Sequence, residues 1–503
     1  MKGVAASAAA LFAGGSRRGR RSRTGEGVAG RGPDPADVAA PALLLLCLFL
    51  GGSSGGGLLA NALLQIAAGA TALWLVWRGA PGDAPAPARA LLILAGVAAG
   101  WIALTLVPLP PALWAALPGR GVVADGYDLL GMAHPWAPLS LAPDASIALL
   151  LSFIPPVAMF LAVVHASPAG RRAAVLLLAG FAFLSVLVGV AQQVGGPDAD
   201  LFLYADSGGV GAVGFFANRN HLATLCLMTL PFLAAFAARG RRSRRGGERV
   251  GGWTLPAAAL ALLAVGALLV QSRAGVLLLF PTSIACLLVF RGRGRSKRAL
   301  AIGVAATAVA AASVLLSVPA SVGELSLSDI GPRERLDFAA TTWRAALDFL
   351  PFGAGPGSFD QVYPLHEDLG SIRLGYVNHA HDDYLELLLE AGLVGAALLG
   401  AFLFWWVGRI RAAWGPDGGP FTRAAVVAVG VVLAHGLVDY PIRTAAIAAV
   451  AALACAVAAS PEPAAARGGG DRRPARGRDA IMLGRGARAA SLSRLPSGAF
   501  QSS

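Results

Sequence analysis

The chain has 503 residues, of which 56% are hydrophobic and 14% are charged, and its formal net charge is +13. A soluble protein of this length carries about 25% charged residues, so the composition excludes an ordinary soluble enzyme. The arginines gather in short loops between apolar runs, which favours the cytoplasmic loops of a membrane protein over a nucleic-acid-binding surface.

Apolar runs of bilayer length recur along the chain and predict an all-α polytopic membrane protein with about twelve transmembrane helices. The predicted spans are 38–52, 56–77, 89–108, 146–166, 172–194, 219–238, 253–271, 274–290, 299–318, 385–408, 422–438 and 442–459. Pro155 and Pro156 fall inside the fourth span and should kink it, because proline has no N–H to donate.

The spans divide the chain into five regions. These are a disordered basic N-terminus (1–35), nine helices (36–318), a large loop with short helices (319–384), three helices (385–460) and a disordered basic tail (461–503). Arginine-rich connections alternate with acidic ones along the chain. The bias of basic residues toward the cytoplasm therefore predicts that both termini are cytoplasmic and that the large loop lies outside.

Two polar segments border predicted spans on the outer face. Asn218, Arg219, Asn220 and His221 enter the sixth span in succession; Asn218 could simply cap the helix, but four polar residues in a row favour a pocket for sugar hydroxyls. Arg273 joins the seventh and eighth spans. It could snorkel or pair with an acid, but its forked donors match phosphate oxygens and favour a phosphate clamp.

The large loop contains a helix-like segment, 334–350, whose apolar spacing predicts a helix along the membrane surface. Arg333, Arg335 and Arg344 are all candidates for a second phosphate contact. Arg344 is the candidate that we select, because it lies on the amphipathic stretch.

The start of the tenth span carries His379, His381, Asp382 and Asp383. Charge near a bilayer is costly, so a polar cluster there is a candidate site. Acids also suit the positive end of a helix, which is the structural alternative for the two aspartates. His381 is a natural general base near neutral pH. The His-x-His-x-Asp spacing resembles metallohydrolase ligands, but those usually end a buried strand, so we predict no metal.

His435 and Asp439 lie four residues apart at the outer end of the eleventh span. They share one helical face and could form a hydrogen-bonded pair that braces the helices or orients an arginine. The four cysteines lie within apolar runs without paired spacing, which predicts neither a disulfide nor a zinc site.

Taken in order, these segments resemble the O-antigen ligase/polymerase family of polytopic, lipid-linked glycan transferases. The matching segments are Gly214–His221, Ser272-Arg273, Trp343–Leu347, Pro351–Phe359, His381 with Gly392 and Gly395, and His435–Pro441. Asp382 departs from the asparagine that is commonest in the family, which leaves the choice between ligase and polymerase open.

The resemblance implies a glycosyltransferase of lipopolysaccharide or polysaccharide biosynthesis in the bacterial inner membrane. It would move a glycan from a polyprenyl-diphosphate donor, such as undecaprenyl diphosphate, to an acceptor hydroxyl on the outer face, without a cofactor or nucleic acid. His381 and Arg273 would be catalytic. The expected substrate-binding residues are Asn218, Asn220, His221, Arg344, His379, Asp382, Asp383 and Asp439.

Two alternatives remain open at this point. A repeat-unit polymerase of the same family would share the fold and the site. A transporter of lipid-linked sugars would place charge at mid-bilayer on broken helices, whereas the polar residues here gather at helix ends on one face.

Overall fold

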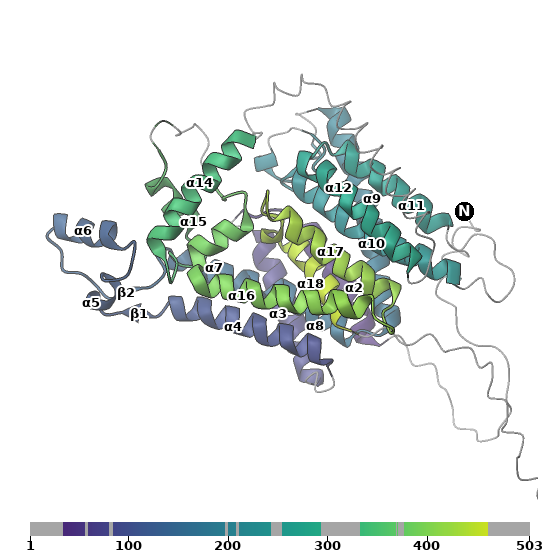
Figure 1. Ribbon diagram of the computed structural model, residues 1–503, viewed down its shortest axis with the longest axis horizontal. Helices are drawn as coiled ribbons and strands as arrows, with labels where there is room; N and C mark the ends of the chain where they lie inside the picture. The colour runs from purple at the N-terminus through teal and green to yellow at the C-terminus, as the bar shows by residue number, and fades with distance from the viewer. Residues whose placement is uncertain are drawn as a thin grey trace, which may run out of the picture. The chain divides into compact units, whose positions relative to one another are not determined.

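The computed structural model describes residues 34–55, 59–79, 84–196, 200–207, 211–242, 254–292, 332–368, 370 and 377–460. Over these residues the chain is almost entirely helical (Figure 1), which confirms the all-α class. Their single sheet is the antiparallel pair of β1 (Pro108–Leu109) and β2 (Ala137–Pro138). The predicted ninth span, 299–318, and both predicted disordered ends except residues 34–35 lie outside the described residues.

Seven helical segments in the described part are long and apolar enough to cross a membrane. They are α3 (Leu59–Arg78), α4 (Ala86–Thr105), α7 (Pro143–Ser152) with α8 (Ile154–His165), α9 (Pro168–Gly195), α10 (Arg219–Arg242), α12 (Arg273–Arg291) and α16 (Asp383–Ala413). Four shorter apolar helices accompany them: α2 (Pro35–Leu50), α11 (Thr254–Leu269), α17 (Pro420–His435) and α18 (Ala445–Ala459). These segments coincide with eleven of the predicted spans, and the total of twelve stays a prediction.

The fourth predicted span is interrupted where its prolines predict. α7 ends at Ser152 and α8 begins at Ile154, immediately before Pro155 and Pro156. Neither proline can donate a hydrogen bond to the preceding turn, and their rings crowd its carbonyls. The helix is thus interrupted at the predicted place, and the kink itself stays a prediction.

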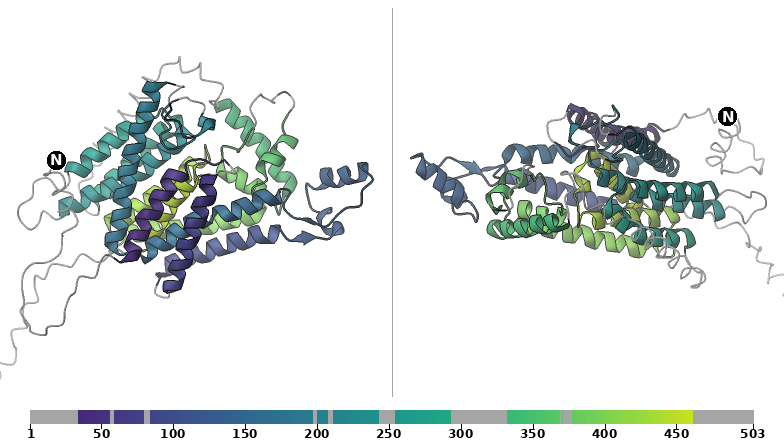
Figure 2. Two further views of the ribbon diagram at one scale, coloured as in Figure 1. Left: turned by 180° about the vertical axis from the view of Figure 1, so that it is seen from behind. Right: turned by 90° about the horizontal axis from the view of Figure 1, so that it is seen from above.

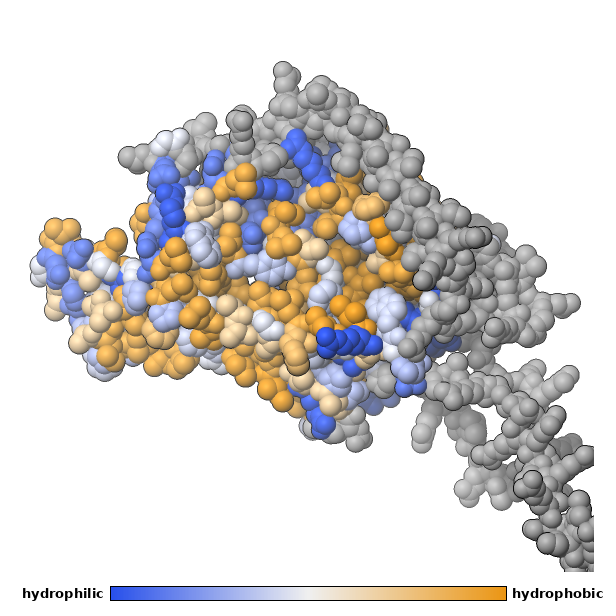
Figure 3. Space-filling view, in the orientation of Figure 1, coloured by the Kyte–Doolittle hydropathy of each residue, from blue (hydrophilic) through white to orange (hydrophobic). Residues whose placement is uncertain are grey.

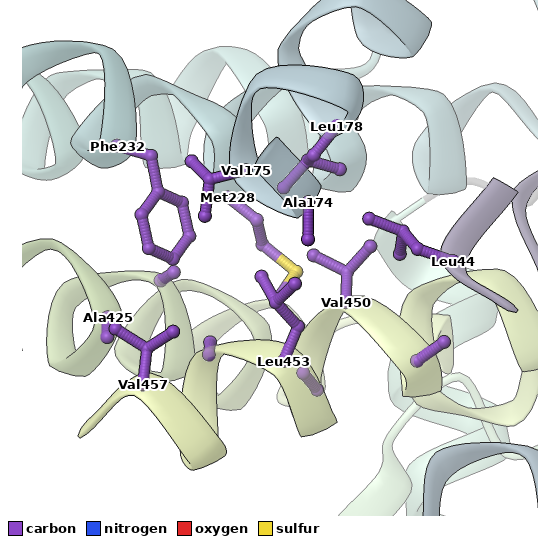
Figure 4. Packing of buried hydrophobic residues seen from close by; sticks show 14 of the residues in the cluster. Leu44, Ala174, Val175, Leu178, Met228, Phe232, Ala425, Val450, Leu453 and Val457 are labelled. Carbon is purple, nitrogen blue, oxygen red and sulfur yellow. The ribbon is translucent and has the colours of Figure 1, made fainter. Parts of the chain in front are cut away.

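α10 lies at the centre of the helical assembly and packs against α9, α11, α12, α17 and α18. Figure 4 shows Met228 and Phe232 of α10 facing Leu453 and Val457 of α18. Ten of the fifteen residues of α18 are alanine, and nearly all of the helix is buried. Small side chains let helix backbones approach closely, which is how helices associate in a bilayer.

The periphery of the assembly is apolar. α2 packs on α9, and α3 packs on α8, as the view from behind in Figure 2 shows. The face over α4 and α16 is mostly hydrophobic (Figure 3), and it exposes large side chains such as Phe404, which is 82% accessible. An apolar exterior of this kind suits lipid rather than water.

A second layer of short elements lies at one end of α4 and α16 (Figure 1). It contains α5 (Pro111–Trp114) and α6 (Gly121–Leu129) with the β-pair, and α14 (Pro332–Phe349), α15 (Phe359–Val362) and the 3₁₀ turn η4 (Tyr363–Leu365). α14 packs on α16 around a small hydrophobic core that includes Phe338, Phe349 and Tyr363.

α14 confirms the helix predicted over 334–350. The apolar stripe that predicted it, including Leu336, Trp343 and Leu347, is exposed, while Phe338 and Phe349 on another face are buried. Because both faces of α14 are apolar, the sequence pattern alone does not identify the core-facing side. The contact of the exposed stripe with a membrane surface stays a prediction.

Candidate active site

His381 and Asp439 form the centre of a buried polar cluster. His381 Nδ1 lies 3.1 Å from Asp439 Oδ1, and the two residues are 6% and 0% exposed. His381 comes from the loop before α16, and Asp439 comes from the turn between α17 and the 3₁₀ turn η6 (Pro441–Arg443). Since an ionised carboxylate can only accept, His381 Nδ1–H is the donor and Nε2 is left as the basic atom.

The backbone at His381 is held in an unusual conformation. Its φ is +51°, in the left-handed region that costs a non-glycine residue roughly 1–2 kcal/mol. Hydrogen bonds on both sides fix it: Ala380 N–H donates to Glu386 Oε2 at 2.9 Å, and Asp383 N–H donates to Gly436 O at 2.8 Å. Such strain persists only where the surroundings over-determine it, and it concentrates at functional sites.

Several buried polar atoms around this pair have no hydrogen-bond partner among the described residues. They are His381 Nε2, both ring nitrogens of His221, His435 Nε2 and Asp439 Oδ2. Buried polar atoms in proteins are nearly always hydrogen-bonded. Five unpartnered atoms in one cluster therefore indicate a place where a polar ligand or water completes the bonding.

The ring of Tyr440 contacts three histidines of the cluster. Its ring centroid lies 4.2 Å from that of His379, 4.9 Å from His381 and 5.5 Å from His221. Its hydroxyl is hydrogen-bonded to the Asn218 side chain, among others. One aromatic side chain thus joins segments before α10, before α16 and after α17.

Asp439 is ionised at neutral pH. Burial raises the pKa of its carboxyl, but the hydrogen bond from His381 and the nearby imidazoles of His221 and His435 outweigh burial, so the pKa is lowered. The negatively charged carboxylate therefore faces the His381 ring at hydrogen-bond distance.

A buried ion network lies beside the pair. Arg443 Nη1 is 3.1 Å from Glu386 Oε1, Nε is 3.4 Å from Asp383 Oδ1, and Nη2 is 3.6 Å from Glu390 Oε2. His379 Nδ1 also contacts Glu386 Oε1, at 2.8 Å. Burial lowers the pKa of Arg443, but the three carboxylates raise it by a larger amount. The pKa is therefore raised overall, and the guanidinium stays charged. The network ties η6 to the first turns of α16.

Asp382 is the N-cap of α16. Its Oδ1 accepts from Tyr384 N at 2.9 Å and from Leu385 N at 3.0 Å. Burial raises the pKa of this carboxyl more than these two hydrogen bonds lower it. The side chain therefore has the structural role considered for it, and a role in substrate binding stays a prediction.

Gly392 lets the second layer of short elements pack directly on α16. The helix is interrupted there by a φ of +56°, and Leu393 N–H donates to Pro351 O at 2.9 Å. A Cβ at Gly392 would overlap Pro351 O, and a Cβ at Gly353 would overlap Glu390 O. The two glycines thus allow the 351–355 segment to cross the helix backbone in direct contact.

Arg273 is positioned next to the segment that enters α10. Asn218 caps α10 by accepting from Asn220 N at 2.8 Å. Asn220 Oδ1 accepts from Ser272 Oγ at 2.7 Å, and Ser272 Oγ caps α12 by accepting from Gly275 N at 3.0 Å. Arg273 is the first residue of α12, and its side chain is exposed.

The arginines of α14 differ in their surroundings. Phe338 stacks on His381 with centroids 6.1 Å apart, and Arg335 lies one turn earlier on the same helix, close enough to His435 for their charges to interact. Arg335 Nε is buried without a partner. Arg344, which the sequence favoured, instead pairs with Asp368 at 3.0 Å at an exposed position. The side chain of Arg333 lies outside the described part.

Sequence reasoning missed Arg443 and misjudged the side-chain partner of His435. Arg443 follows Tyr440 by three residues, and a charged residue entering an apolar helix was the available signal. His435 Nδ1 pairs with Thr224 Oγ1 at 2.7 Å; the alternative of a side-chain pair with Asp439 is not what the structure shows. Among the described residues, no group of three potential ligands is arranged to hold a metal ion.

The fold and the cluster together define a polytopic helical membrane protein with a buried histidine–aspartate site where its helices begin and end. Residues 258–400 match the model of the O-antigen ligase family, which supports the resemblance drawn from the motifs. The match includes Arg273, Arg335, His381 and Glu386 but stops before Asp439. A search of the curated proteins finds no match.

The family and the apolar helices support an O-antigen ligase or polymerase type of function in a bacterial inner membrane.

Proposed function

We propose that the protein transfers a glycan from a polyprenyl-diphosphate donor to an acceptor hydroxyl on the outer face of the inner membrane, with His381 as general base. One observation carries the proposal: His381 Nδ1 is engaged by Asp439, while its Nε2 is buried and has no partner among the described residues. A base needs this arrangement, because one ring nitrogen must be fixed and the other must be available to the substrate.

In the proposed reaction, His381 Nε2 accepts the proton of the acceptor hydroxyl as its oxygen attacks the anomeric carbon of the donor glycan. The bond from that carbon to the phosphate oxygen breaks, and the polyprenyl diphosphate leaves with the electron pair. The imidazolium that forms is stabilised by the Asp439 carboxylate. General-base catalysis of this kind contributes about 10²–10⁴ in rate.

The leaving diphosphate gains negative charge, which arginines can stabilise. Arg273 is our candidate, supported by its exposed position at the start of α12 and by the Ser272–Asn220 hydrogen bond that ties its turn to the cluster. Arg335 is a second candidate, supported by its unpartnered Nε near His435.

The remaining predicted residues divide into three groups within this proposal. Asn218, Asn220 and His221 would contact the glycan, since both ring nitrogens of His221 are buried without a partner. The others, His379, Asp382 and Asp383, would position the His381 loop through the contacts described above. The pair of Arg344 with Asp368 is exposed and could open for a substrate.

The test uses purified protein in nanodiscs with a lipid-linked glycan and an acceptor glycolipid, with products separated on a gel. We expect His381→Ala and Arg273→Ala to lose product ladders at normal protein levels. His366→Ala is the matched control, because His366 is a histidine near α15 and η4 that pairs with Asp348 at the surface. Wild-type ladders from both test variants would refute the proposed mechanism.

Two further assays, one in cells and one in liposomes, separate the alternatives. In cells, loss of a ligase should accumulate long polymer on the lipid carrier, whereas loss of a repeat-unit polymerase should leave single units. A transporter would move the lipid-linked glycan across liposomes without joining it to an acceptor.

A further inference from the structure

A cavity of about 290 Å³ opens in the second layer of short elements, between the 114–143 segment and the α15–η4 segment. Its wall combines two aromatic rings, a guanidinium, a hydroxyl and an amide with aliphatic side chains. The residues that carry the argument are Trp114, Arg120, Val123, Tyr127 and Gln361. A volume at the lower end of the usual range for ligand pockets suits one small ring rather than an extended chain.

Arg120 is a buried cation that has no acidic partner in the part of the chain that the structure describes. It is 2% exposed, and its Nη atoms donate only to the backbone carbonyls of Pro118, Leu139 and Gly353, while Phe349 packs on its guanidinium at 5.2 Å. Its Nε has no partner among the described residues. Burial lowers the pKa of Arg120 to about 10, and no carboxylate acts in the opposite direction. A charge buried in this way is costly unless an anion compensates it.

The aromatic side of the cavity is rigid. Trp114 Nε1 donates to Pro135 O at 2.8 Å, and the indole packs against Tyr127 at 6.3 Å and His134 at 5.5 Å between centroids. The negative face of an aromatic ring attracts the weakly positive C–H groups of a sugar ring. Because these rings are already fixed, a sugar that binds them loses little additional side-chain entropy.

The cavity is connected to the Arg443 network through two sets of contacts. Gly353, whose carbonyl accepts from Arg120, lies against the kink of α16 at Gly392. Gln361 belongs to α15, whose first residue, Phe359, donates its N–H to Glu390 Oε1 at 3.3 Å. Glu390 is a member of the Arg443 network. The cavity is therefore joined by direct contacts to residues that neighbour the candidate active site.

We propose that this cavity binds a single sugar ring that carries a carboxylate, such as a uronic acid unit of the glycan substrate. The ring would pack on Trp114 and Tyr127, Gln361 would hydrogen-bond its hydroxyls, and the carboxylate would approach the remaining donors of Arg120. This inference rests on the proposed function, because that function supplies the glycan.

Binding is measured by saturation-transfer NMR on the full chain in nanodiscs. The probes are the methyl glycosides of glucuronic and galacturonic acid and, for comparison, of glucose and galactose. We expect dissociation constants of about 1 mM for an acidic glycoside and binding about tenfold weaker for its neutral parent.

Two tryptophan substitutions on α6 form a matched pair. Val123→Trp fills the cavity from its rim and should abolish the signal, whereas Leu129→Trp changes a residue that is 88% exposed on the same helix and should preserve it. In a transfer assay, Val123→Trp should raise KM for whichever substrate, donor or acceptor, carries the acidic sugar.

The proposal is overturned if neutral and acidic glycosides bind equally, if none binds, or if Val123→Trp leaves binding intact. His381→Ala keeps the two hypotheses apart. Binding that persists in this variant supports the cavity whatever happens to transfer. Transfer without any sugar binding in the wild type would refute the cavity and leave the proposed function standing.

Discussion

Replacing Asp439 by asparagine tests the proposed base most directly. The substitution keeps the shape of a fully buried side chain but removes the charge that lies 3.1 Å from His381 Nδ1. Two unit charges at that separation interact by about 5 kcal/mol at an effective dielectric constant of about 20. This value is an upper estimate, because both charges are delocalised. An asparagine can also present its own N–H to Nδ1 and so favour the tautomer with a protonated Nε2.

We therefore expect Asp439→Asn to lower kcat by about 10²–10⁴, equivalent to about 3–5 kcal/mol, with little change in KM for the acceptor. The assay is initial-rate transfer in nanodiscs. Asp348→Asn is the control, because it breaks an exposed pair with His366 and should leave kcat unchanged. A double variant with His381→Ala should be no slower than His381→Ala alone. A kcat for Asp439→Asn within about threefold of wild type would refute the proposal that Asp439 supports His381 as the base.

Three further predictions concern stability in detergent. Gly392→Ala should lower the unfolding free energy by more than about 1 kcal/mol, read as a lower melting temperature, because φ is +56° and Pro351 O blocks a Cβ. Arg443→Met should cost about 3–5 kcal/mol by leaving buried carboxylates unpaired, whereas Arg344→Met, at an exposed pair, should cost about 0–1 kcal/mol. Because the pKa of Asp439 is lowered, its contribution to the free energy of unfolding is fully present above the unfolded pKa of about 3.9 and is lost as pH falls through the folded pKa. The melting temperature of Asp439→Asn should therefore change less over this acidic range than that of the wild type.

Most of the fold could be predicted because its signals are local. A bilayer-length apolar run predicts a helix by itself, and an apolar helix overlaps each predicted span that lies within the described residues. The break at Phe153 followed from two prolines in sequence. The side of α14 that packs on the core was not predictable in the same way. Its two faces are similarly apolar, and only contacts with distant residues choose between them.

The site could be predicted only as far as single segments allow. Residues 378–383 identified His381, because titratable groups at a membrane surface are costly and rare. Its partner Asp439 lies 58 residues away, and no spacing rule joins them. Arg443 was hidden for the same reason: it looks like a charged residue at the end of an apolar helix until the folded chain pairs it with Glu386.

The distribution of charge in the cluster favours an anionic substrate. The acids are engaged internally, with Glu386 and Glu390 on Arg443, Asp439 on His381, and the remaining aspartates on Arg443 or a helix N-terminus. Arg273 and Arg335, in contrast, have no acidic partner among the described residues. Unpaired carboxylates would repel a diphosphate, and guanidinium groups with unused donors attract one. The same folding that holds the proposed base in place thus leaves guanidinium groups available for the diphosphate of the proposed donor.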